Sequence, residues 1–208
     1  MKVLLINGSP KTKGCTYTAL SEVAKELQNA NIETEIFHVG TKPIGGCTAC
    51  NGCNITNAGK CVFYDDNVNI ALEKAKEVDG FIFGSPVHYA AASGQITSFL
   101  DRFFYAGDGF QYKPGASIVS CRRGGATAAF EQLNKYFTIS SMPIVSSQYW
   151  NAVHGNTPDE VEQDLEGMQT MRTLGKNMAW LLKSIQAGKE AGITLPEKES
   201  RAVTNFIR

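Results

Sequence analysis

Residues 2–16 decide the fold, and they read Lys2-Val3-Leu4-Leu5-Ile6-Asn7-Gly8-Ser9-Pro10-Lys11-Thr12-Lys13-Gly14-Cys15-Thr16. The run Val3–Ile6 is apolar at every position, which predicts a strand buried on both faces of a sheet. The next segment, Thr16–Asn29, carries apolar residues at the spacing of one helix face. A buried strand that runs through a small-residue loop into a helix is the opening unit of an α/β domain.

The remainder of the chain repeats this alternation of short apolar strands and amphipathic helices. Thr157-Pro158-Asp159-Glu160 indicates a helix start, because it combines a capping threonine, a first-turn proline and acids at the positive end of the dipole. Five strands separated by helices predict a parallel sheet covered on both faces. We expect one domain, residues 1–186, and a C-terminal tail, residues 187–208. The predicted strands are 2–7, 33–39, 81–83, 116–120 and 144–149, and the predicted helices are 16–29, 67–77, 94–105, 128–137 and 158–185.

Composition narrows the class of protein. The 208 residues include 20 Lys plus Arg and 20 Asp plus Glu, so the chain has no excess of basic residues. The composition therefore gives no reason to expect a nucleic-acid or membrane partner. With 43% hydrophobic and 19% charged residues, the chain fits a globular domain with a sizeable core. No apolar run approaches a membrane span, and no signal-peptide core precedes the first strand. We therefore expect a cytoplasmic protein whose cysteines are thiols, metal ligands or catalytic groups rather than structural disulfides.

Ligands of open parallel sheets bind at the carboxyl ends of the strands, so a site is expected in the segments after each strand. After the first strand, Gly8–Thr16 offers backbone N–H groups, the hydroxyls of Ser9 and Thr16 and a helix N-terminus, which together suit a phosphate. The loop lacks the Gly-Lys-Ser/Thr ending of a Walker loop, and the Gly-x-Gly-x-x-Gly of a dinucleotide site is absent. The alternative is an ordinary strand-to-helix turn.

Two further strand ends carry candidate residues. After the third strand, Gly84–Tyr89 contains a proline that fixes the turn, and His88 either contacts a ligand or merely packs. After the fourth strand, Cys121–Gly125 contains two glycines that permit close backbone approach. Either Arg122 or Arg123 supplies a cation to a ligand there, or both form a solvated surface pair.

Taken in order and spacing, these segments resemble the NAD(P)H-dependent FMN reductases and iron–sulfur flavoproteins of the flavodoxin-like superfamily. The resemblance runs from Met1 to about Lys183, and it also includes Gly94-Gln95 with Asp101-Arg102. It implies a flavodoxin-like doubly wound α/β fold with a five-stranded parallel sheet in the order 2-1-3-4-5. It further implies bound FMN, NAD(P)H as co-substrate, a small electron acceptor (quinone, flavin or azo compound) and a homodimer or homotetramer.

The same resemblance assigns the cofactor-binding residues. It places the FMN phosphate in the loop from Ser9 to Thr16 and isoalloxazine contacts at Pro86–Tyr89 and Cys121–Gly125. Cys15 is a departure, since such loops often carry serine or another small polar residue. No catalytic side chain is expected, because hydride passes from the nicotinamide to the flavin directly. The predicted cofactor-binding residues are Ser9, Lys11, Gly14, Cys15, Thr16, Pro86, Val87, His88, Tyr89, Cys121, Arg122, Arg123, Gly124 and Gly125.

Four cysteines crowd into one unpatterned segment, Gly40–Asp65, in the arrangement C-x2-C-x2-C-x7-C. So compact a run is more typical of iron–sulfur ligation than of the two separated C-x2-C knuckles of structural zinc. In iron–sulfur flavoproteins a similar run holds a 4Fe–4S cluster, whereas many relatives keep cysteines there without one. Three interpretations stay open: a cluster, a zinc ion, and free thiols, of which we favour the last. The candidate ligands are Cys47, Cys50, Cys53 and Cys61.

Three functions follow from these features. The leading hypothesis is an FMN-dependent NAD(P)H oxidoreductase that reduces a small acceptor. The second is an iron–sulfur flavoprotein that carries electrons through a 4Fe–4S cluster. The third is an FMN-binding or redox-sensing module without turnover, which would bind flavin but oxidise no nicotinamide.

Overall fold

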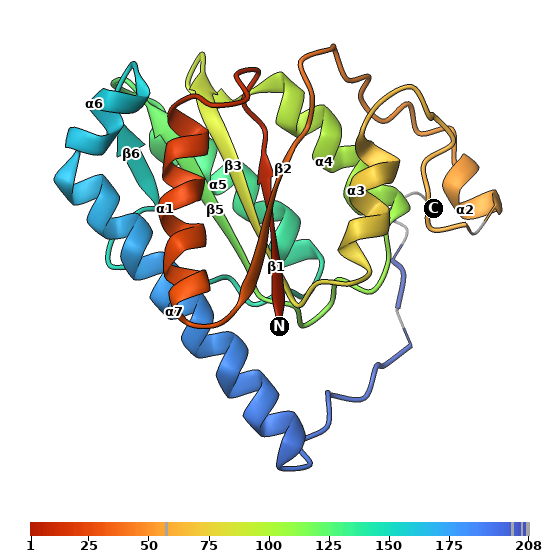
Figure 1. Ribbon diagram of the computed structural model, residues 1–208. Helices are drawn as coiled ribbons and strands as arrows, with labels where there is room; N and C mark the ends of the chain where they lie inside the picture. The colour runs from red at the N-terminus through yellow and green to blue at the C-terminus, as the bar shows by residue number, and fades with distance from the viewer. Residues whose placement is uncertain (57, 201, 205, 207–208) are drawn as a thin grey trace.

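The computed structural model describes residues 1–56, 58–200, 202–204 and 206 and shows strands alternating with helices along the chain (Figure 1). Residues 201, 205, 207 and 208 of the predicted tail lie outside the described residues. The elements are β1 (Lys2–Asn7), α1 (Cys15–Asn29), β2 (Glu33–His38), α2 (Gly52–Thr56), α3 (Val68–Ala75), β3 (Gly80–His88), β4 (Ala91–Ala92), α4 (Gly94–Ala106), β5 (Gly115–Cys121), α5 (Ala126–Ile139), β6 (Ala152–His154), α6 (Pro158–Gln163) and α7 (Leu165–Glu190).

The sheet is parallel in the order β2-β1-β3-β5-β6, and the two-residue β4 pairs antiparallel with the end of β3. The predicted doubly wound fold class is therefore confirmed, with β4 as a sixth strand that the sequence did not suggest. Neighbouring strands are paired so that Asn7 at the end of β1 lies beside Gly84 in β3, and Gly84 lies beside Ile118 in β5. As a result, the carboxyl ends of β1, β3 and β5 meet at one edge of the sheet.

The prediction of the fifth strand at residues 144–149 is wrong. Only Ile144 pairs there, in an isolated bridge to Gly115, and the strand at this edge is β6. The Ser147 hydroxyl donates to the Tyr149 carbonyl and accepts from the Tyr149 N–H, so the backbone turns locally and leaves the ladder. The chain rejoins the sheet afterwards, where Ala152 pairs with Val119.

The long predicted C-terminal helix is interrupted at Asp164. This residue has φ −75° and ψ 81°, outside the helical region, and its carboxylate accepts from the Gly167 N–H at 2.9 Å, so it caps a new helix. The Thr157 cap of α6 is confirmed, since its hydroxyl accepts from the Glu160 N–H. Leu165 and Ile185 follow the helical spacing of the buried residues of α7, but both are exposed.

Helices cover both faces of the sheet (Figure 1). One face packs α1 and α7 against the strands, and the other packs α3, α4 and α5 against an aromatic core. In that core the rings of Phe83 and Phe137 stack at 4.9 Å between centroids. Burying one such ring contributes about 1.5–3 kcal/mol, so the strand ends rest on a rigid base.

Between β2 and α3 the chain has little regular structure, as the absence of periodicity predicted, apart from the five-residue α2. The N-cap of α3 is Asn67, whose side chain makes no capping bond, and just before it the Asp66 carboxylate accepts from the Val68 N–H at 3.1 Å. Among the described residues, no helix is both long and apolar enough to span a membrane.

Candidate functional site

The loop after β1 is organised from within by a buried asparagine. The Asn7 side chain accepts from the Ser9 N–H and donates to the Thr12 carbonyl, each at 3.1 Å. Gly8 is required because a Cβ there would lie 2.5 Å from the Cβ of Ile96. His38 supports the same loop from β2, since its Nε2 hydrogen-bonds the Ser9 carbonyl at 2.8 Å. The loop is therefore held in shape by protein groups alone.

Two buried hydroxyls lie at the start of α1. Ser9 is 5% exposed and Thr16 is 1% exposed. The Thr16 hydroxyl shares a hydrogen bond of 2.8 Å with the hydroxyl of Ser120, which reaches it from the end of β5. No side chain caps α1 at Gly14, and its first turn holds no acid. Hydroxyls and an uncapped helix N-terminus together form a binding place for an anion.

The opposite wall comes from the end of β3 and the loop after β5. The β3–β4 hairpin turns at Tyr89 and Ala90, which have φ 48° and 61°, and the Tyr89 side chain is fully exposed. A Cβ at Gly125, where φ is 91°, would lie 2.5 Å from the Ala90 Cα, so this glycine lets the hairpin meet the start of α5. The Cys121 thiol donates to the Gly124 carbonyl at 3.2 Å and fixes the loop.

These walls enclose a hollow of about 210 Å³, which we call the strand-end pocket. Four residues in its lining were not on the predicted list: Pro10, which lies within the predicted phosphate loop, Ser120, which directly precedes a predicted segment, and Gly155 and Asn156, which follow the misplaced fifth strand. Of the predicted cofactor residues, Gly14, Tyr89, Cys121, Arg123, Gly124 and Gly125 do not line it. The pocket is lined by Ser9, Pro10, Lys11, Cys15, Thr16, Pro86, Val87, His88, Ser120, Arg122, Gly155 and Asn156.

Cys15 ties two walls of this pocket together. Its thiol lies 3.8 Å from the Gly155 carbonyl, across 140 residues of sequence. Burial raises the pKa of the Cys15 thiol above its usual value, which keeps the sulfur protonated and able to donate. A serine would fill the same role, so the departure from the family's usual loop leaves the geometry intact.

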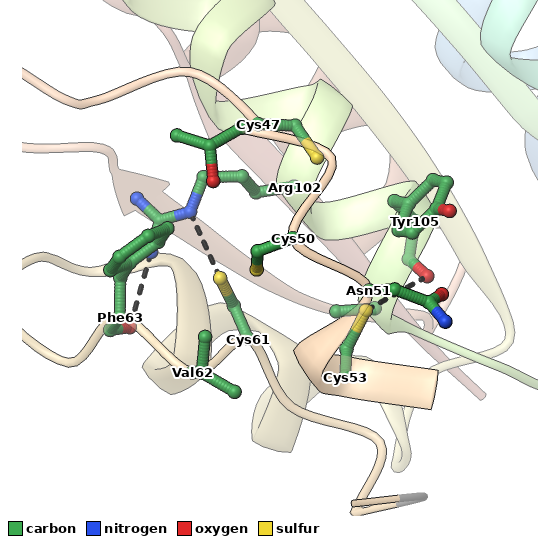
Figure 2. Close-up of a pocket in the computed structure, with 11 residues that line it drawn as sticks. Cys47, Cys50, Asn51, Cys53, Cys61, Val62, Phe63, Arg102 and Tyr105 are labelled. Atoms are coloured by element: carbon green, nitrogen blue, oxygen red, sulfur yellow. Dashed lines mark hydrogen bonds between the residues drawn. The ribbon is translucent and has the colours of Figure 1, made fainter. Parts of the chain in front are cut away.

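The four clustered cysteines line a second, much smaller hollow (Figure 2). Its free volume is about 10 Å³, roughly enough for one water molecule. Cys47 and Cys50 are exposed, whereas Cys61 is buried. Hydrogen bonds from the Gly52 N–H and the Thr48 hydroxyl lower the pKa of Cys50. We call this hollow the cysteine pocket, and it is lined by Cys47, Thr48, Cys50, Asn51, Cys53, Cys61, Val62, Phe63, Arg102, Tyr105 and Ala106.

As arranged, the four sulfurs do not form a metal site. In the part of the chain that the structure describes, no three His, Cys, Asp or Glu side chains are grouped so that they could hold a metal ion. Two sulfurs have other partners: Cys61 accepts from Nε of Arg102 at 3.2 Å, and Cys53 lies 3.9 Å from the Tyr105 carbonyl (Figure 2). The donor set suits a cluster, but the present geometry does not.

Arg102 on α4 is the residue of this region that sequence reasoning left without a role. It is 2% exposed and forms an ion pair with Asp66. Its N–H groups also donate to the carbonyls of Gly45 and Phe63, so one guanidinium joins both ends of the cysteine segment to α4. A cation between the apolar residues Phe99 and Phe103 of a predicted helix face was the signal that could have identified it.

The charge of Arg102 is held in place despite its burial. Burial lowers the pKa of the guanidinium, but the hydrogen bonds to Asp66 and Cys61 outweigh this effect and raise the pKa overall. The side chain therefore stays a cation beneath the cysteine pocket. A buried cation of this kind stabilises negative charge on any sulfur that faces it.

Comparison with known proteins agrees with this arrangement. The model of the NADPH-dependent FMN reductase family matches residues 1–157. An iron–sulfur flavoprotein of Methanocaldococcus jannaschii is 35% identical over 89% of this chain and 100% of its own length. An FMN-dependent NADPH-azoreductase of Staphylococcus saprophyticus is 32% identical over 55% of this chain and 57% of its own length. Among solved structures, an archaeal flavodoxin superposes with a TM-score of 0.59 and 15% identity, covering 88% of this chain and 99% of the flavodoxin.

The match to the family model covers all four segments that line the strand-end pocket, up to its last lining residue, Asn156. The likeness to flavodoxin independently confirms the fold predicted from the strand pattern. The chain therefore belongs to the NADPH-dependent FMN reductase family, the flavodoxin-like FMN oxidoreductases.

Proposed function

We propose that this protein binds FMN in the strand-end pocket, takes electrons from NADH or NADPH, and passes them to a small acceptor such as a quinone, a free flavin or an azo compound. One observation carries the proposal: three largely buried hydroxyl residues, Ser9, Thr16 and Ser120, line one pocket beside the uncapped start of α1, and the ends of four parallel strands contribute to that pocket. The Ser9 hydroxyl accepts from the Lys11 N–H, and Thr16 and Ser120 share one hydrogen bond, so among the described residues the O–H of Ser9 and one O–H of the pair can still donate to an anion at the helix N-terminus.

The phosphate of FMN is assigned to the loop from Ser9 to Thr16. This part of the pocket offers a phosphate the hydroxyls, the N–H groups of the first turn of α1 and the ammonium group of Lys11. Charge-assisted hydrogen bonds to such an oxyanion contribute about 1.5–3 kcal/mol each. Because no second phosphate loop and no ribose-binding acid follow β2, the monophosphate FMN fits better than FAD.

The isoalloxazine ring is assigned to the space between Pro86–His88 and the loop after β5. Arg122 lines the strand-end pocket and Arg123 does not, so Arg122 is the cation that we place near the pyrimidine edge of the ring. When bound, FMN supplies the chemistry that accepts a hydride and releases one or two electrons. Arg122 then stabilises the negative charge of the reduced form, and Pro86 and Val87 exclude water from one side.

The choice of small acceptors is supported by a relative that is named an azoreductase. Tyr89 is fully exposed at the rim of the site, where it would flank an aromatic acceptor. The expected homodimer or homotetramer remains a prediction. It is supported by the exposure of Trp180 on α7, which runs beyond the edge of the sheet (Figure 1).

The proposal is tested by loading the protein with flavin and following nicotinamide oxidation. We expect the flavin released on denaturation to be FMN and the oxidation of NADH or NADPH to depend on an added quinone, flavin or azo dye. The control is the same assay with flavin-free protein. Released FAD, failure of FMN to bind, or bound FMN without nicotinamide oxidation would contradict the proposal, and the last result would favour a binding module.

A second candidate function is that of an iron–sulfur flavoprotein, with a 4Fe–4S cluster in the cysteine pocket. It is favoured by the convergence of the four cysteines on one pocket and by the name of the Methanocaldococcus jannaschii relative. Ligation would require the four cysteines to rearrange, because Arg102 hydrogen-bonds the Cys61 sulfur and the pocket has room for about one water molecule. Iron and sulfide content of anaerobically prepared protein tests this candidate.

A further inference from the structure

A third hollow, beside the proposed flavin site, lies at the free edge of the sheet, at β6. Its volume is about 370 Å³, within the range of small-molecule pockets. It opens between the start of α5, the segment before β6 and the start of α7. We call it the edge pocket, and it is lined by Arg123, Gly125, Ala126, Thr127, Tyr149, Trp150, Ala152, His154, Asp164, Glu166, Gly167 and Thr170.

One end of the edge pocket suits a phosphate. Arg123 is exposed and forms no salt bridge within the described part of the chain. Beside it, the 14-residue helix α5 begins at Ala126 with no side-chain cap at Gly125 and no acid in its first turn. A free guanidinium and the unpaired N–H groups of a long helix together attract an anion.

The pocket is also lined by a largely buried threonine of α7, Thr170. Thr170 is 2% exposed and lines the pocket, yet among the described residues its side chain makes no hydrogen bond. Among the described residues, the side-chain atoms that are both buried and unpartnered belong to Ser21 and Asn151, so the Thr170 hydroxyl keeps some access to the pocket. A polar ligand in the pocket would satisfy this group.

A flat, aromatic ligand fits the wall before β6. The rings of Tyr149 and Trp150 pack edge to face at 4.7 Å between centroids, and the residues are 61% and 51% exposed. They are therefore rigid but uncovered, as stacking surfaces are. Two carboxylates line the pocket. Asp164 accepts hydrogen bonds from the backbone N–H groups of His154 and Gly167, whereas the exposed Glu166 can accept from the hydroxyls of a ligand.

The edge pocket adjoins the strand-end pocket across two loops. Arg122 lines the strand-end pocket and Arg123 the edge pocket, while His154 lines the edge pocket and Gly155 the strand-end pocket. A ligand longer than either hollow could thus reach from the aromatic wall to the flavin ring.

We propose that the edge pocket binds the adenosine-phosphate half of the reduced nicotinamide nucleotide. Arg123 and the start of α5 would hold phosphate, Tyr149 and Trp150 would stack on adenine, and Glu166 would accept from the ribose hydroxyls, as acidic residues do in other nucleotide sites. The nicotinamide end would then extend into the strand-end pocket. This inference rests on the proposed function, and it adds the site from which the electron donor approaches.

The test uses adenosine monophosphate and adenosine diphosphate as probes of the FMN-loaded protein. The chain has two tryptophans, so Trp180→Phe, an exposed change on α7, leaves Trp150 as the only tryptophan reporter. We expect both probes to quench this fluorescence. Arg123→Gln should weaken their binding and raise the KM for NADH or NADPH at least about tenfold, as loss of one charge-assisted hydrogen bond implies. Lys189→Gln, which removes an exposed cation at the far end of α7, is the matched control and should change neither.

Several outcomes separate this inference from the proposed function. Nicotinamide oxidation with an unchanged KM in Arg123→Gln, or no quenching by either probe, would overturn the edge pocket and leave the proposed function standing. A rise in the KM of the quinone instead of the nicotinamide would also overturn it, because the pocket would then take the acceptor. Adenosine binding that Arg123→Gln weakens, without nicotinamide oxidation, would support the pocket and contradict the proposed function.

Discussion

The strand-end pocket and the cysteine pocket differ in what holds them together. The first has buried hydroxyls that bond to one another, as Thr16 does to Ser120, and it rests on strands whose side chains form the core. The second is lined by four thiols, two of them exposed, on a segment with one short helix, and that segment is held mainly by polar contacts from Arg102, Asn69 and Gln95.

The difference shows which kind of site a protein can shape before its ligand arrives. A pocket at the ends of buried strands inherits the rigidity of the core, so its geometry needs no cofactor. Thiol ligands are brought together by the ion itself, and the binding free energy is then partly folding free energy. We therefore expect the cysteine segment to be the less stable region, and the following predictions test this contrast.

The largest expected effect concerns the cysteines. If the segment holds a 4Fe–4S cluster, anaerobically prepared protein should contain about four iron atoms per FMN. Changing any one of Cys47, Cys50, Cys53 or Cys61 to serine should abolish iron binding and leave FMN bound, because the two pockets are separate. Cys15→Ser, which alters a thiol of the strand-end pocket, is the control and should keep its iron. An iron content near zero after reconstitution with iron and sulfide would show that the four cysteines are free thiols.

The next effect concerns Arg102. Arg102→Met leaves the carboxylate of Asp66, which is 9% exposed, without its partner, so we expect the free energy of unfolding to fall by about 3–5 kcal/mol. Adding Asp66→Asn removes the unpaired charge and should restore much of that loss. Urea unfolding measures both variants. Equal stability of the single and double variants would mean that the ion pair does not anchor the cysteine segment.

A smaller effect separates the two neighbouring arginines. Arg122→Ala removes a cation from the strand-end pocket, so the anionic reduced flavin should lose on the order of 1 kcal/mol of stabilisation. For a two-electron couple, this loss lowers the reduction potential of the flavin by about 20 mV. Arg123→Ala should change the potential less, since Arg123 lines the edge pocket. Redox titration of both variants is the measurement. Identical potentials in the wild type and both variants would place neither arginine at the ring.

The smallest effect concerns Ser93 beneath the strand-end pocket. Its hydroxyl donates to the Gly8 carbonyl at 2.9 Å and accepts from the Ile96 N–H at 3.4 Å, as the cap of α4. Ser93→Ala should lower the free energy of unfolding by about 1 kcal/mol and leave FMN affinity nearly unchanged, because Asn7 and His38 still hold the loop. Urea unfolding and FMN titration check this. A large loss of affinity would show that the pocket lacks the redundancy we assign to it.

Much of the strand-end pocket could be predicted because its residues follow strands with strong local signals. The run Val3–Ile6 and the small-residue loop after it fix one wall with no reference to the rest of the fold. The end of β6 could not be placed, because Ile144–Tyr149 has the stronger strand pattern and only tertiary pairing selects Ala152–His154 instead. Gly155 and Asn156 were missed as a direct consequence.

Side-chain roles that depend on partners far away in the sequence could not be predicted either. Asp164 ends α6 and caps α7 because its carboxylate also meets the His154 N–H, ten residues away and on another element. The ion pair of Arg102 with Asp66 joins a helix to a loop 36 residues earlier. The spacing of the cysteines predicted a shared site but could not decide its occupant, since the same thiols suit a cluster, zinc or no metal.

The central claim is that the loop from Ser9 to Thr16 binds the phosphate of FMN. Calorimetric titration of FMN and of riboflavin, which lacks only the phosphate, isolates this contact in the wild type and in Ser9→Ala/Thr16→Ala. We predict that the wild type prefers FMN by well over tenfold, from two charge-assisted hydrogen bonds of about 1.5–3 kcal/mol each, and that the double variant loses most of this preference while binding riboflavin as before. An equal preference for FMN in both proteins would place the phosphate elsewhere and contradict the account.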